Sequence, residues 1–384
     1  MNNPLQAILQ TLSAEARTEQ PFLSIYLDWT TDSNGKRPAR TILQQELDRI
    51  DTKLEQRSEQ RASFERDRAA IVRYLDEEAP RDARSIAIFA CDAERVWVTV
   101  PLLIPLETYI AADRFPHVFQ LARVLDDHEP VVVARAEGQD AEIFVLGLET
   151  MEQVATTSAS ETVNRVQVGG WSQLRYQNHN AFVIRSHMQD LAANIEQILA
   201  EHQAERLVVI GNDAIKGALL DVLPSALQQR MLGFVSFDRT VDAEALYSGL
   251  EPLLREAEDI QEVEQIQRWE NQLATKGGLA CAGIDAVATA LSKGQVDTLL
   301  IEQSFAADGR ECPGCAMLFS DAWVTCPYDG SDLVAVPLRE AFTARALGQS
   351  GAVQVVALRG MLGEQAGVGA LLRYRDDVAT AVGE

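Results

Sequence analysis

Apolar residues in the first third of the chain follow first a strand period and then a helix period. Residues 22–29, FLSIYLDW, alternate in the manner of a half-buried strand, and the polar cluster at residues 32–35 ends it. Between about residues 39 and 75, apolar side chains recur at three-and-four spacing in a charged background. This pattern predicts either one long helix or a helical hairpin broken near residues 58–63.

Two further strands are predicted beyond this helical region. Residues 85–90 and 95–102 are apolar runs that suit a hairpin turning over residues 91–94. We therefore expect residues 1–125 to form an α+β N-terminal domain with a long charged helix. Within it, His117 is expected to lie at the surface or in a capping role.

The middle of the chain has the element order of an α/β domain. Residues 131–149 hold two strands around a turn at 137–140. A helical apolar pattern over residues 184–199 precedes a continuous apolar strand at 206–212, and another strand begins at MLGFVSFD. We expect residues 126–240 to form an α/β domain with a mixed sheet.

A third block follows an acidic helix predicted over residues 242–274. GGLACAGIDAVATALSKGQVDTLLIEQ contains a helix, a turn at residues 293–295 and a buried strand, and the tail adds two strands. Residues 241–384 are therefore expected to form a third, α/β domain. An insertion at 310–332 differs in composition from its surroundings, while the acid-free stretch 341–363 is expected to be ordinary strand and turn.

The composition fits a globular cytoplasmic protein. The 384 residues are 47% hydrophobic and 24% charged, and no apolar run approaches the roughly 20 residues that span a bilayer. Five cysteines, three of them close together, do not suggest a disulfide framework. The formal net charge of −23 argues against polyanion binding by the whole surface, so any RNA contact must be local.

One segment stands out against this acidic background. The 28 residues from Thr162 to Gln189 contain no Asp or Glu, and GGWSQLRYQ lies at their centre. Glycines give such a segment access to tight turns, and its cations can pair with phosphates. We interpret it as a loop that contacts RNA. Its candidate RNA-binding residues are Arg165, Trp171, Arg175, His179 and Arg185.

The insertion at 310–332 contains the clearest candidate metal-binding motif of the chain. Cys312-Pro-Gly-Cys315 and Cys326-Pro-Tyr-Asp329-Gly330 are two similar turns, and a tetrahedral zinc site takes its four ligands from two such turns. No histidine follows His202, so Asp329 is the best remaining candidate for the fourth ligand. The alternative is a degenerate ribbon with three reduced cysteines and no metal. A closed site of this kind is structural rather than catalytic.

GGLACAGIDAVATALSKGQVDTLLI and the closing segment GVGALLRYR resemble the third domain of a known family. This family is that of the archaeo-eukaryotic class-one release factors and Pelota, with their bacterial relatives, and the resemblance covers residues 126–384. It implies three domains, with an RNase-H-like middle domain that carries a catalytic loop. It also implies a zinc ribbon inserted in the third domain, as in archaeal members.

The resemblance assigns roles to the GGWSQ segment. In the family, a Gly-Gly-Gln loop promotes hydrolysis of peptidyl-tRNA at the ribosomal peptidyl-transferase centre. Here Trp171 and Ser172 separate Gly169 and Gly170 from Gln173, so the segment is closer to the Gly-x-Ser-Gln loops of relatives that free stalled nascent chains. The resemblance implies that Gln173 is the catalytic glutamine. It also implies that the two glycines give the backbone the flexibility to approach the substrate. The loop is expected directly before the long helix.

These features together predict an enzyme. The expected function is a ribosome-associated peptidyl-tRNA hydrolase that releases stalled chains, without stop-codon decoding, since no Asn-Ile-Lys-Ser stretch is found. The alternative is a ribosome-binding hibernation or occupancy factor without catalysis. A third alternative is an acidic zinc-bearing scaffold unrelated to ribosomes. The expected partners are the large ribosomal subunit with peptidyl-tRNA, and a translational GTPase at the third domain.

Overall fold

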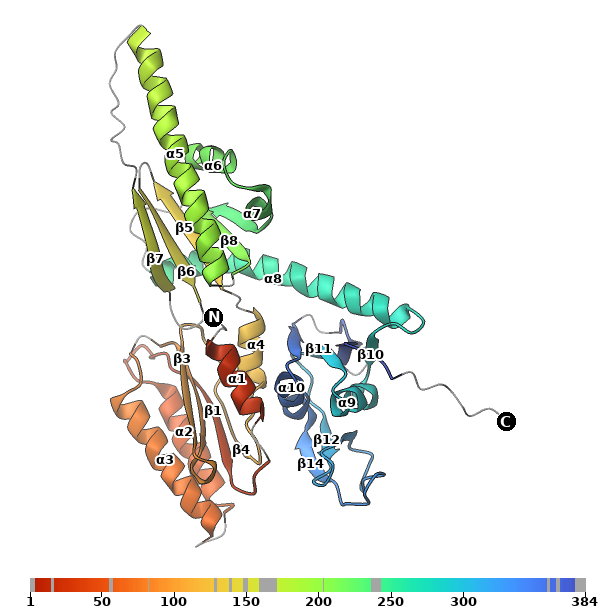
Figure 1. Ribbon diagram of the computed structural model, residues 1–384. Helices are drawn as coiled ribbons and strands as arrows, with labels where there is room; N and C mark the ends of the chain where they lie inside the picture. The colour runs from red at the N-terminus through yellow and green to blue at the C-terminus, as the bar shows by residue number, and fades with distance from the viewer. Residues whose placement is uncertain are drawn as a thin grey trace. The chain divides into compact units, whose positions relative to one another are not determined.

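The fold is mixed α/β with several sheets, as the sequence predicts. The computed structural model describes residues 4–14, 17–54, 58–81, 83–127, 130–137, 140–147, 151–158, 171–202, 204–235, 243–357, 360–363 and 367–376 (Figure 1). Apart from Met1, the chain forms two compact units. One comprises residues 128–260, and the other comprises residues 2–127 together with 261–384. The division into domains 1–125, 126–240 and 241–384 stays a prediction.

The larger unit begins with a four-stranded antiparallel sheet of order β3-β2-β1-β4. Its strands are β1 (Phe22–Asp28), β2 (Ser85–Cys91), β3 (Val96–Leu102) and β4 (Tyr109–Asp113). The short helix η1 (Asp92–Glu94) makes the expected hairpin turn between β2 and β3. The edge strand β4 was not predicted from the sequence, because its YIAAD segment is too short to show a clear period.

Helices α2 (Pro38–Asp51) and α3 (Glu59–Glu77) form the helical hairpin that was one of the two predicted alternatives. Ser58 begins α3 as an N-cap, with its hydroxyl accepting a hydrogen bond from Arg61 N at 3.1 Å. The apolar stripes of the two helices pack on one face of the sheet. Leu47, Phe64 and Ile71 are fully buried there.

The C-terminal part of the larger unit contains a second sheet of order β10-β16-β11-β15. Its strands are β10 (Ala280–Ala282), β11 (Val296–Glu302), β15 (Ala352–Val356) and β16 (Val368–Leu372). Only β11 and β15 pair in parallel, among the described strands of this sheet. Its helices are α9 (Ile284–Ser292) and α10 (Leu338–Gly348). The expectation of strand and turn over 341–363 is wrong at its start, because the Ala- and Leu-rich sequence of α10 favours a helix.

Hydrogen bonds to one buried and one half-buried carboxylate join the N-terminal and C-terminal parts of this unit. Helices α1 (Pro4–Ala14) and α4 (Phe119–Asp127) both pack on α10. Glu340, which is buried, accepts a hydrogen bond from Phe119 N at 3.0 Å. Asp126 accepts one from Val355 N at 2.7 Å. A buried carboxylate without such donors is costly, so these bonds help to fix the two parts together.

The insertion predicted at 310–332 is a small three-stranded sheet within the larger unit. Its strands are β12 (Asp308–Glu311), β13 (Leu318–Ser320) and β14 (Val334–Pro337), in the order β13-β12-β14. The buried Glu311 lies between two arginines, with Arg17 Nε at 2.8 Å and Arg345 at 3.1 Å. The insertion is therefore tied both to α10 and to the segment that follows α1.

The smaller unit is built on a mixed sheet of order β7-β6-β5-β8-β9, as predicted. Its strands are β5 (Val131–Glu137), β6 (Asp140–Leu146), β7 (Met151–Ser158), β8 (Arg206–Ile210) and β9 (Met231–Val235). Its helices are α5 (Trp171–Glu201), α6 (Asp213–Leu220), α7 (Ser225–Gln229) and the first part of α8 (Ala243–Ala274). Strand β7 was not predicted.

Two separate apolar clusters cover the faces of this mixed sheet. Residues of α5, α6 and α7 pack on one face, with Met188, Leu191 and Ile195 fully buried. Leu250 and Leu254 of α8 pack on the other face. Both faces of β5 and β8 are therefore buried where the two strands pair, which explains the apolar runs VVVA of β5 and LVVI of β8.

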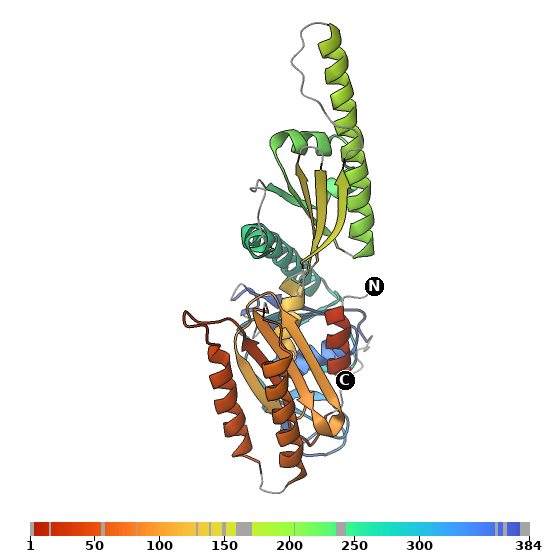
Figure 2. The ribbon, with the colours of Figure 1, turned by 90° about the vertical axis from the view of Figure 1, so that its left-hand side faces the viewer.

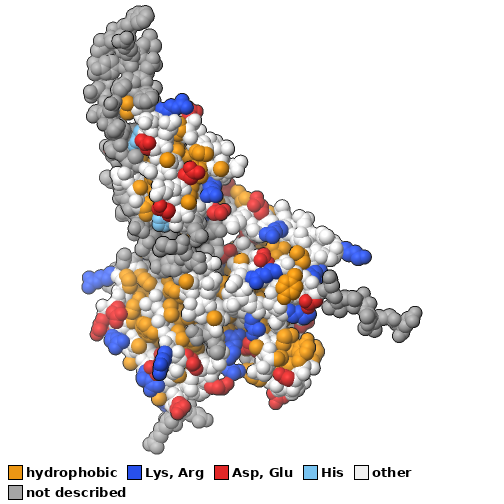
Figure 3. Space-filling view, viewed as in Figure 1, with side chains coloured by type: hydrophobic (Ala, Val, Ile, Leu, Met, Phe, Trp, Pro, Cys, Tyr) orange, Lys and Arg blue, Asp and Glu red, His pale blue; other side chains and the backbone are white. Residues whose placement is uncertain are grey.

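The acidic net charge is not gathered in one patch on the face drawn in Figure 3, where basic and acidic side chains are interspersed. Among the described residues, no helix combines the length and the apolar character needed to cross a bilayer.

Candidate functional site

The first turn of the candidate metal centre follows β12 directly. Cys312 N donates to Met317 O, and Ala316 N donates to Cys312 O, both at 2.9 Å. These bonds fold residues 312–317 into a tight turn in which Cys315 N points at Cys312 Sγ, 3.4 Å away. Ala316 takes a positive φ of 56° to close it. The turn therefore has the shape of a metal-binding knuckle, as the sequence predicts.

The second turn connects β13 to β14 and repeats this geometry. Gly330 N donates to Cys326 O at 3.0 Å, and Cys326 N donates to Ser331 O at 2.8 Å. Gly330 has a φ of +74°, a conformation that side-chain-bearing residues rarely adopt. The cysteine at the start of this turn and the aspartate near its end consequently face the same side.

The two turns bring together all four predicted ligands. The nearest ligand atoms of Cys312, Cys315, Cys326 and Asp329 all lie within 4.8 Å of one another. Cys315 Sγ lies 3.6 Å from Cys326 Sγ, and Cys312 Sγ lies 3.2 Å from Asp329 Oδ2. A tetrahedral zinc with metal–sulfur bonds of about 2.3 Å places its sulfurs about 3.8 Å apart. The cluster therefore fits a tetrahedral metal with little rearrangement.

Local hydrogen bonds prepare the carboxylate to serve as a ligand. Asp329 Oδ1 accepts a hydrogen bond from Ser331 N at 2.9 Å. This main-chain bond is the largest of the effects that lower the pKa of Asp329 to about 2. The carboxylate is therefore ionised at neutral pH, which is the state that binds a cation.

The pKa values of the Cys312 and Cys315 thiols are shifted in opposite directions. Burial raises the pKa of Cys312, but hydrogen bonds from Cys315 and Gly314 outweigh it, and the net pKa is lowered. A main-chain bond with Met317 lowers the pKa of Cys315, but burial and the two neighbouring thiols raise it to about 11. Adjacent thiolates repel each other, and a divalent cation between them removes this penalty. The arrangement thus favours a shared positive ion.

The metal cluster is anchored in the larger unit. Cys312 and Cys326 are buried and pack with Phe319 and Leu333. Arg345 of α10 donates to Ala316 O at 2.8 Å, which holds the first knuckle from outside. Cys315 and Asp329 are exposed. A tetrahedral metal bound by all four groups would have no open coordination position, which is the arrangement of structural rather than catalytic sites.

The second candidate site is the GGWSQ segment between β7 and α5. Gly169, Gly170 and Arg165 lie outside the described residues. Trp171, Ser172 and Gln173 form the first turn of α5, and Arg175 and His179 follow in the same helix. Their side chains are also outside the described part of the structure. Arg185, further along α5, is described and exposed.

The expectation that the loop ends only after GGWSQ is corrected by the start of α5 at Trp171. Residues 171–189 contain neither glycine nor proline, so nothing stops the helix from extending toward the glycine pair. Figures 1 and 2 both show that the first half of α5 projects past the ends of the strands of its own sheet. Residues 171–173 therefore sit at the far end of a projecting helix.

His117 was predicted to lie at the surface or in a capping role, and the surface position is wrong. It is 5% exposed, with Nδ1 2.8 Å from Tyr109 Oη and Nε2 2.8 Å from Asp113 Oδ2. Burial raises the pKa of Tyr109 to about 12, so this tyrosine stays protonated. The three side chains form a structural brace for β4 rather than a nucleophile. The sequence offered no signal for it, because its partners lie on a strand that the periodicity did not reveal.

Both cysteines outside the cluster are protonated at neutral pH. Burial raises the pKa of Cys91, and burial raises the pKa of Cys281 to about 11.

The smaller unit matches a known protein family. Residues 116–262 match the profile of a family of archaeo-eukaryotic release-factor type. This range contains β5 to β9 and the GGWSQ segment, so the predicted resemblance is confirmed over this part of the chain. The family is described as "Bacterial archaeo-eukaryotic release factor family 10". No curated protein matches the chain.

Several solved structures are similar to the whole chain or most of it. The archaeal translation termination factor aRF1 is 17% identical, with 97% of each chain covered and a TM-score of 0.27. Archaeoglobus fulgidus Pelota is 18% identical, with 76% of this chain and 79% of that one covered and a TM-score of 0.35. Dom34 of S. cerevisiae is 11% identical, with 76% and 79% covered and a TM-score of 0.36.

Proposed function

We propose that this protein is a ribosome-associated peptidyl-tRNA hydrolase that releases nascent chains from stalled ribosomes. The observation that carries the proposal is the family match over residues 116–262, which includes the segment with Gly169, Gly170 and Gln173. The position of that segment supports it, because Gln173 lies in the first turn of the projecting helix α5. A group at such a position can enter a narrow site while the domain stays outside.

The proposed chemistry needs no charged catalytic group. The ester between peptide and tRNA is already activated, and its hydrolysis requires a positioned water and donors for the developing oxyanion. The amide of Gln173 offers one donor group and one acceptor group without a charge to desolvate. Ser172 precedes it and adds a hydroxyl. Gly169 and Gly170 allow the backbone to approach the ester closely.

Contacts to RNA position this catalytic segment. Arg165, Arg175 and Arg185 are proposed to pair with phosphates, and such contacts fix the register of a protein on RNA without reading its sequence. Trp171 is proposed to stack on a base, and His179 to contact a phosphate. These are local contacts within an acid-free window, so they are compatible with a net charge of −23.

We further propose that the metal is zinc and that its role is structural. Cys312, Cys315 and Cys326 would supply thiolates, and Asp329 would supply a carboxylate. Bound zinc would hold the two knuckles together in an insertion that is too small to have a large core. The third domain is proposed to contact a translational GTPase, and the protein is proposed to act in the cytoplasm.

The direct test offers purified ribosome–nascent chain complexes to the protein and measures released peptide. Gln173→Ala should reduce the release rate at least about 100-fold and leave co-sedimentation with ribosomes unchanged. Gln189→Ala is the matched control, because Gln189 lies exposed on the same helix, away from its first turn. Wild-type release by the Gln173 variant would refute the catalytic role.

The departure of GGWSQ from Gly-Gly-Gln favours one alternative, a factor that occupies ribosomes without hydrolysis. The same assay separates the two functions. Ribosome binding with no peptide release by the wild-type protein, on either whole ribosomes or large subunits alone, would establish occupancy. Failure to co-sediment with ribosomes at low salt would exclude both functions.

A further inference from the structure

The outer edge of β4 carries main-chain groups whose direction can be deduced. In a strand, the N–H and C=O of one residue point to the same side, and successive residues alternate. Trp29 N donates to Arg84 O at 2.8 Å, on the side of β2, and Asp28 N donates to Thr108 Oγ1 at 3.1 Å, on the side of β4. Even-numbered residues of β1 therefore face β4.

The register of the two strands then fixes which residues of β4 face outward. Tyr109, Ala111 and Asp113 stand opposite the even-numbered residues of β1 and face inward. Ile110 and Ala112 consequently direct their N–H and C=O groups away from the sheet. Among the described residues, no hydrogen bond to these four groups is found. They form a short open edge that can pair with another strand.

One end of this open edge is closed. Arg114 O, beyond the C-terminal end of β4, accepts a hydrogen bond from Thr18 N at 2.9 Å. The opposite edge of the sheet is protected differently. By the same alternation Pro101 of β3 faces outward there, and a proline offers no N–H to an added strand. An open edge thus remains on β4, between residues 110 and 112.

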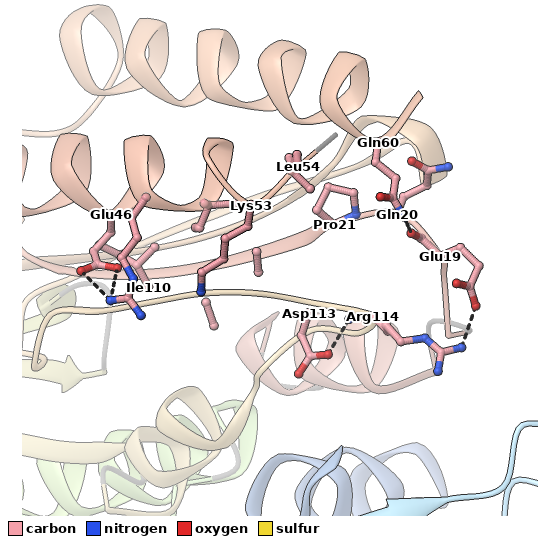
Figure 4. Close-up of a pocket in the computed structure, with 14 residues that line it drawn as sticks. Glu19, Gln20, Pro21, Glu46, Lys53, Leu54, Gln60, Ile110, Asp113 and Arg114 are labelled. Carbon is pink, nitrogen blue, oxygen red and sulfur yellow. Dashed lines mark hydrogen bonds and ion pairs between the residues drawn. The ribbon is translucent and has the colours of Figure 1, made fainter. Parts of the chain in front are cut away.

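A groove with a cavity volume of about 440 Å³ runs along this edge. Residues 110–114 form one wall, and residues of α2 and of the segment after it form the other, so an extended chain would lie between a strand and a helix (Figure 4). Ile50, Leu54 and Pro21 add apolar surface to it. The volume lies within the range of roughly 300–1,000 Å³ that is typical of ligand sites.

The charges along the groove favour an acidic ligand. Each of the three carboxylates of the lining has a partner. Arg114 pairs with Glu19 at 2.9 Å, Arg49 pairs with Glu46 at 3.2 Å, and Asp113 Oδ2 lies 2.8 Å from His117 Nε2. Lys53 is exposed and extends from the helical wall toward β4 (Figure 4), and no carboxylate lies in ion-pair contact with it among the described residues. The lining therefore offers one unpaired positive charge beside the outward main-chain N–H and C=O groups of Ile110 and Ala112.

We propose that this groove binds an extended, acidic peptide segment of a protein partner, which adds a fifth strand to the sheet at β4. Main-chain hydrogen bonds with Ile110 and Ala112 supply the pairing. Alternate side chains of the peptide lie toward the helical wall, where an apolar residue contacts Ile50 and Leu54. An adjacent acidic residue pairs with Lys53. The Tyr109–His117–Asp113 contacts hold β4 in place from within the domain.

The test measures fluorescence anisotropy of a fluorescein-labelled peptide, Thr-Val-Glu-Val-Thr, against the full-length protein. Saturable binding is expected. A peptide N-methylated at the glutamate and both valines lacks the central donors and should bind at least about tenfold more weakly. This comparison uses only wild-type protein, so it does not depend on the folding of any variant. Equal binding of both peptides, or no saturable binding up to millimolar concentration, would overturn the proposal.

Substitutions at Ala112 and Lys53 test the residues of the protein that line the groove. Ala112→Pro removes one outward N–H at an edge position where proline is tolerated, and should weaken binding about tenfold, whereas Ala112→Ser keeps the N–H and should not. Lys53→Glu should weaken binding of the glutamate peptide and strengthen binding of the peptide with lysine at that position. Concentration-dependent dimers abolished by Ala112→Pro, without peptide binding, would instead identify a second copy of the chain as the occupant. Binding of a poly(U) probe abolished by the same variant, again without peptide binding, would likewise refute it.

Discussion

Gly314 and Asp329 approach each other so closely across the two knuckles that a Cβ atom on residue 314 would lie 2.5 Å from Asp329 Oδ2. No real side chain fits at that distance, so the first knuckle requires glycine for the carboxylate to face the thiols. We predict that Gly314→Ala lowers zinc affinity at least about tenfold, because Asp329 is displaced from its position as a ligand.

Competition with a chromogenic chelator measures this affinity. Gly363→Ala is the control, since a Cβ there meets no atom within 4 Å. An unchanged affinity in Gly314→Ala would show that Asp329 does not bind the metal.

Replacement of the fourth ligand tests the metal centre from the other side. Asp329→Cys completes a set of four thiolates and should bind zinc more tightly than the wild type, whereas Asp329→Ala should bind it more weakly. Elemental analysis of the purified protein should give about one zinc per wild-type chain. Zinc retained in Asp329→Ala at wild-type affinity would contradict the proposed ligand set.

We predict that Asp67 makes the stability of the larger unit depend on pH. It is 3% exposed, and burial is the main cause that raises its pKa to about 6, despite a hydrogen bond from Asp92 N at 3.1 Å. Its pKa in the unfolded chain is about 3.9, so between pH 4 and 6 the folded state holds more protons than the unfolded state. The free energy of unfolding should therefore fall as pH rises through this window.

Asp67→Asn should remove this dependence and raise the free energy of unfolding at pH 7 by about 2 kcal/mol. Urea unfolding at pH 4, 5, 6 and 7 measures both effects. Glu65→Gln, at an exposed position of the same helix, serves as the control. An Asn variant with the same slope between pH 4 and 6 as the wild type would show that Asp67 is not the group responsible.

Gly369 of β16 lies against the indole of Trp269. A Cβ on residue 369 would meet Trp269 Cε2 and Cζ2 at 2.7 Å, and this indole is buried and held by a hydrogen bond from Nε1 to Cys281 O. Gly369→Ala should therefore destabilise the protein by about 1–3 kcal/mol, because the ring has to move in a packed core. Thermal unfolding checks this. Gly217→Ala, in a helix with nothing near its Cβ, should be neutral or slightly stabilising.

The parts of the fold that were predicted correctly have strong local periods. The alternation in residues 22–29 gave a strand, although β1 is buried on both faces and not half-buried as predicted. The unbroken apolar run of β8 also gave a strand, and the apolar spacing of residues 184–199 gave a helix. Strand β4 and the start of α10 were missed. Their short or alanine-rich sequences take their conformation from neighbouring elements more than from their own pattern.

The cluster of three cysteines and Asp329 was predictable because residue type and spacing alone point to the candidate ligands. Its supporting contacts were not. Ser331 N, Gly314 and Arg345 act on the cluster through the shape of the turns and through α10, and no motif records them. Similarly, the GGWSQ segment could be located from the sequence, but the residue at which α5 begins could not. The helix starts at Trp171, within this segment, and no local sequence signal marks that start.

The pairing of Arg17 with Glu311 affects how this protein can be divided for expression. A fragment that starts after residue 20 would leave that buried carboxylate with Arg345 as its remaining charged partner. Removal of the first helix would also uncover the surface of α10 that it packs against. Clones intended to produce the C-terminal half in isolation should therefore be compared with ones in which residues 1–20 are supplied in trans.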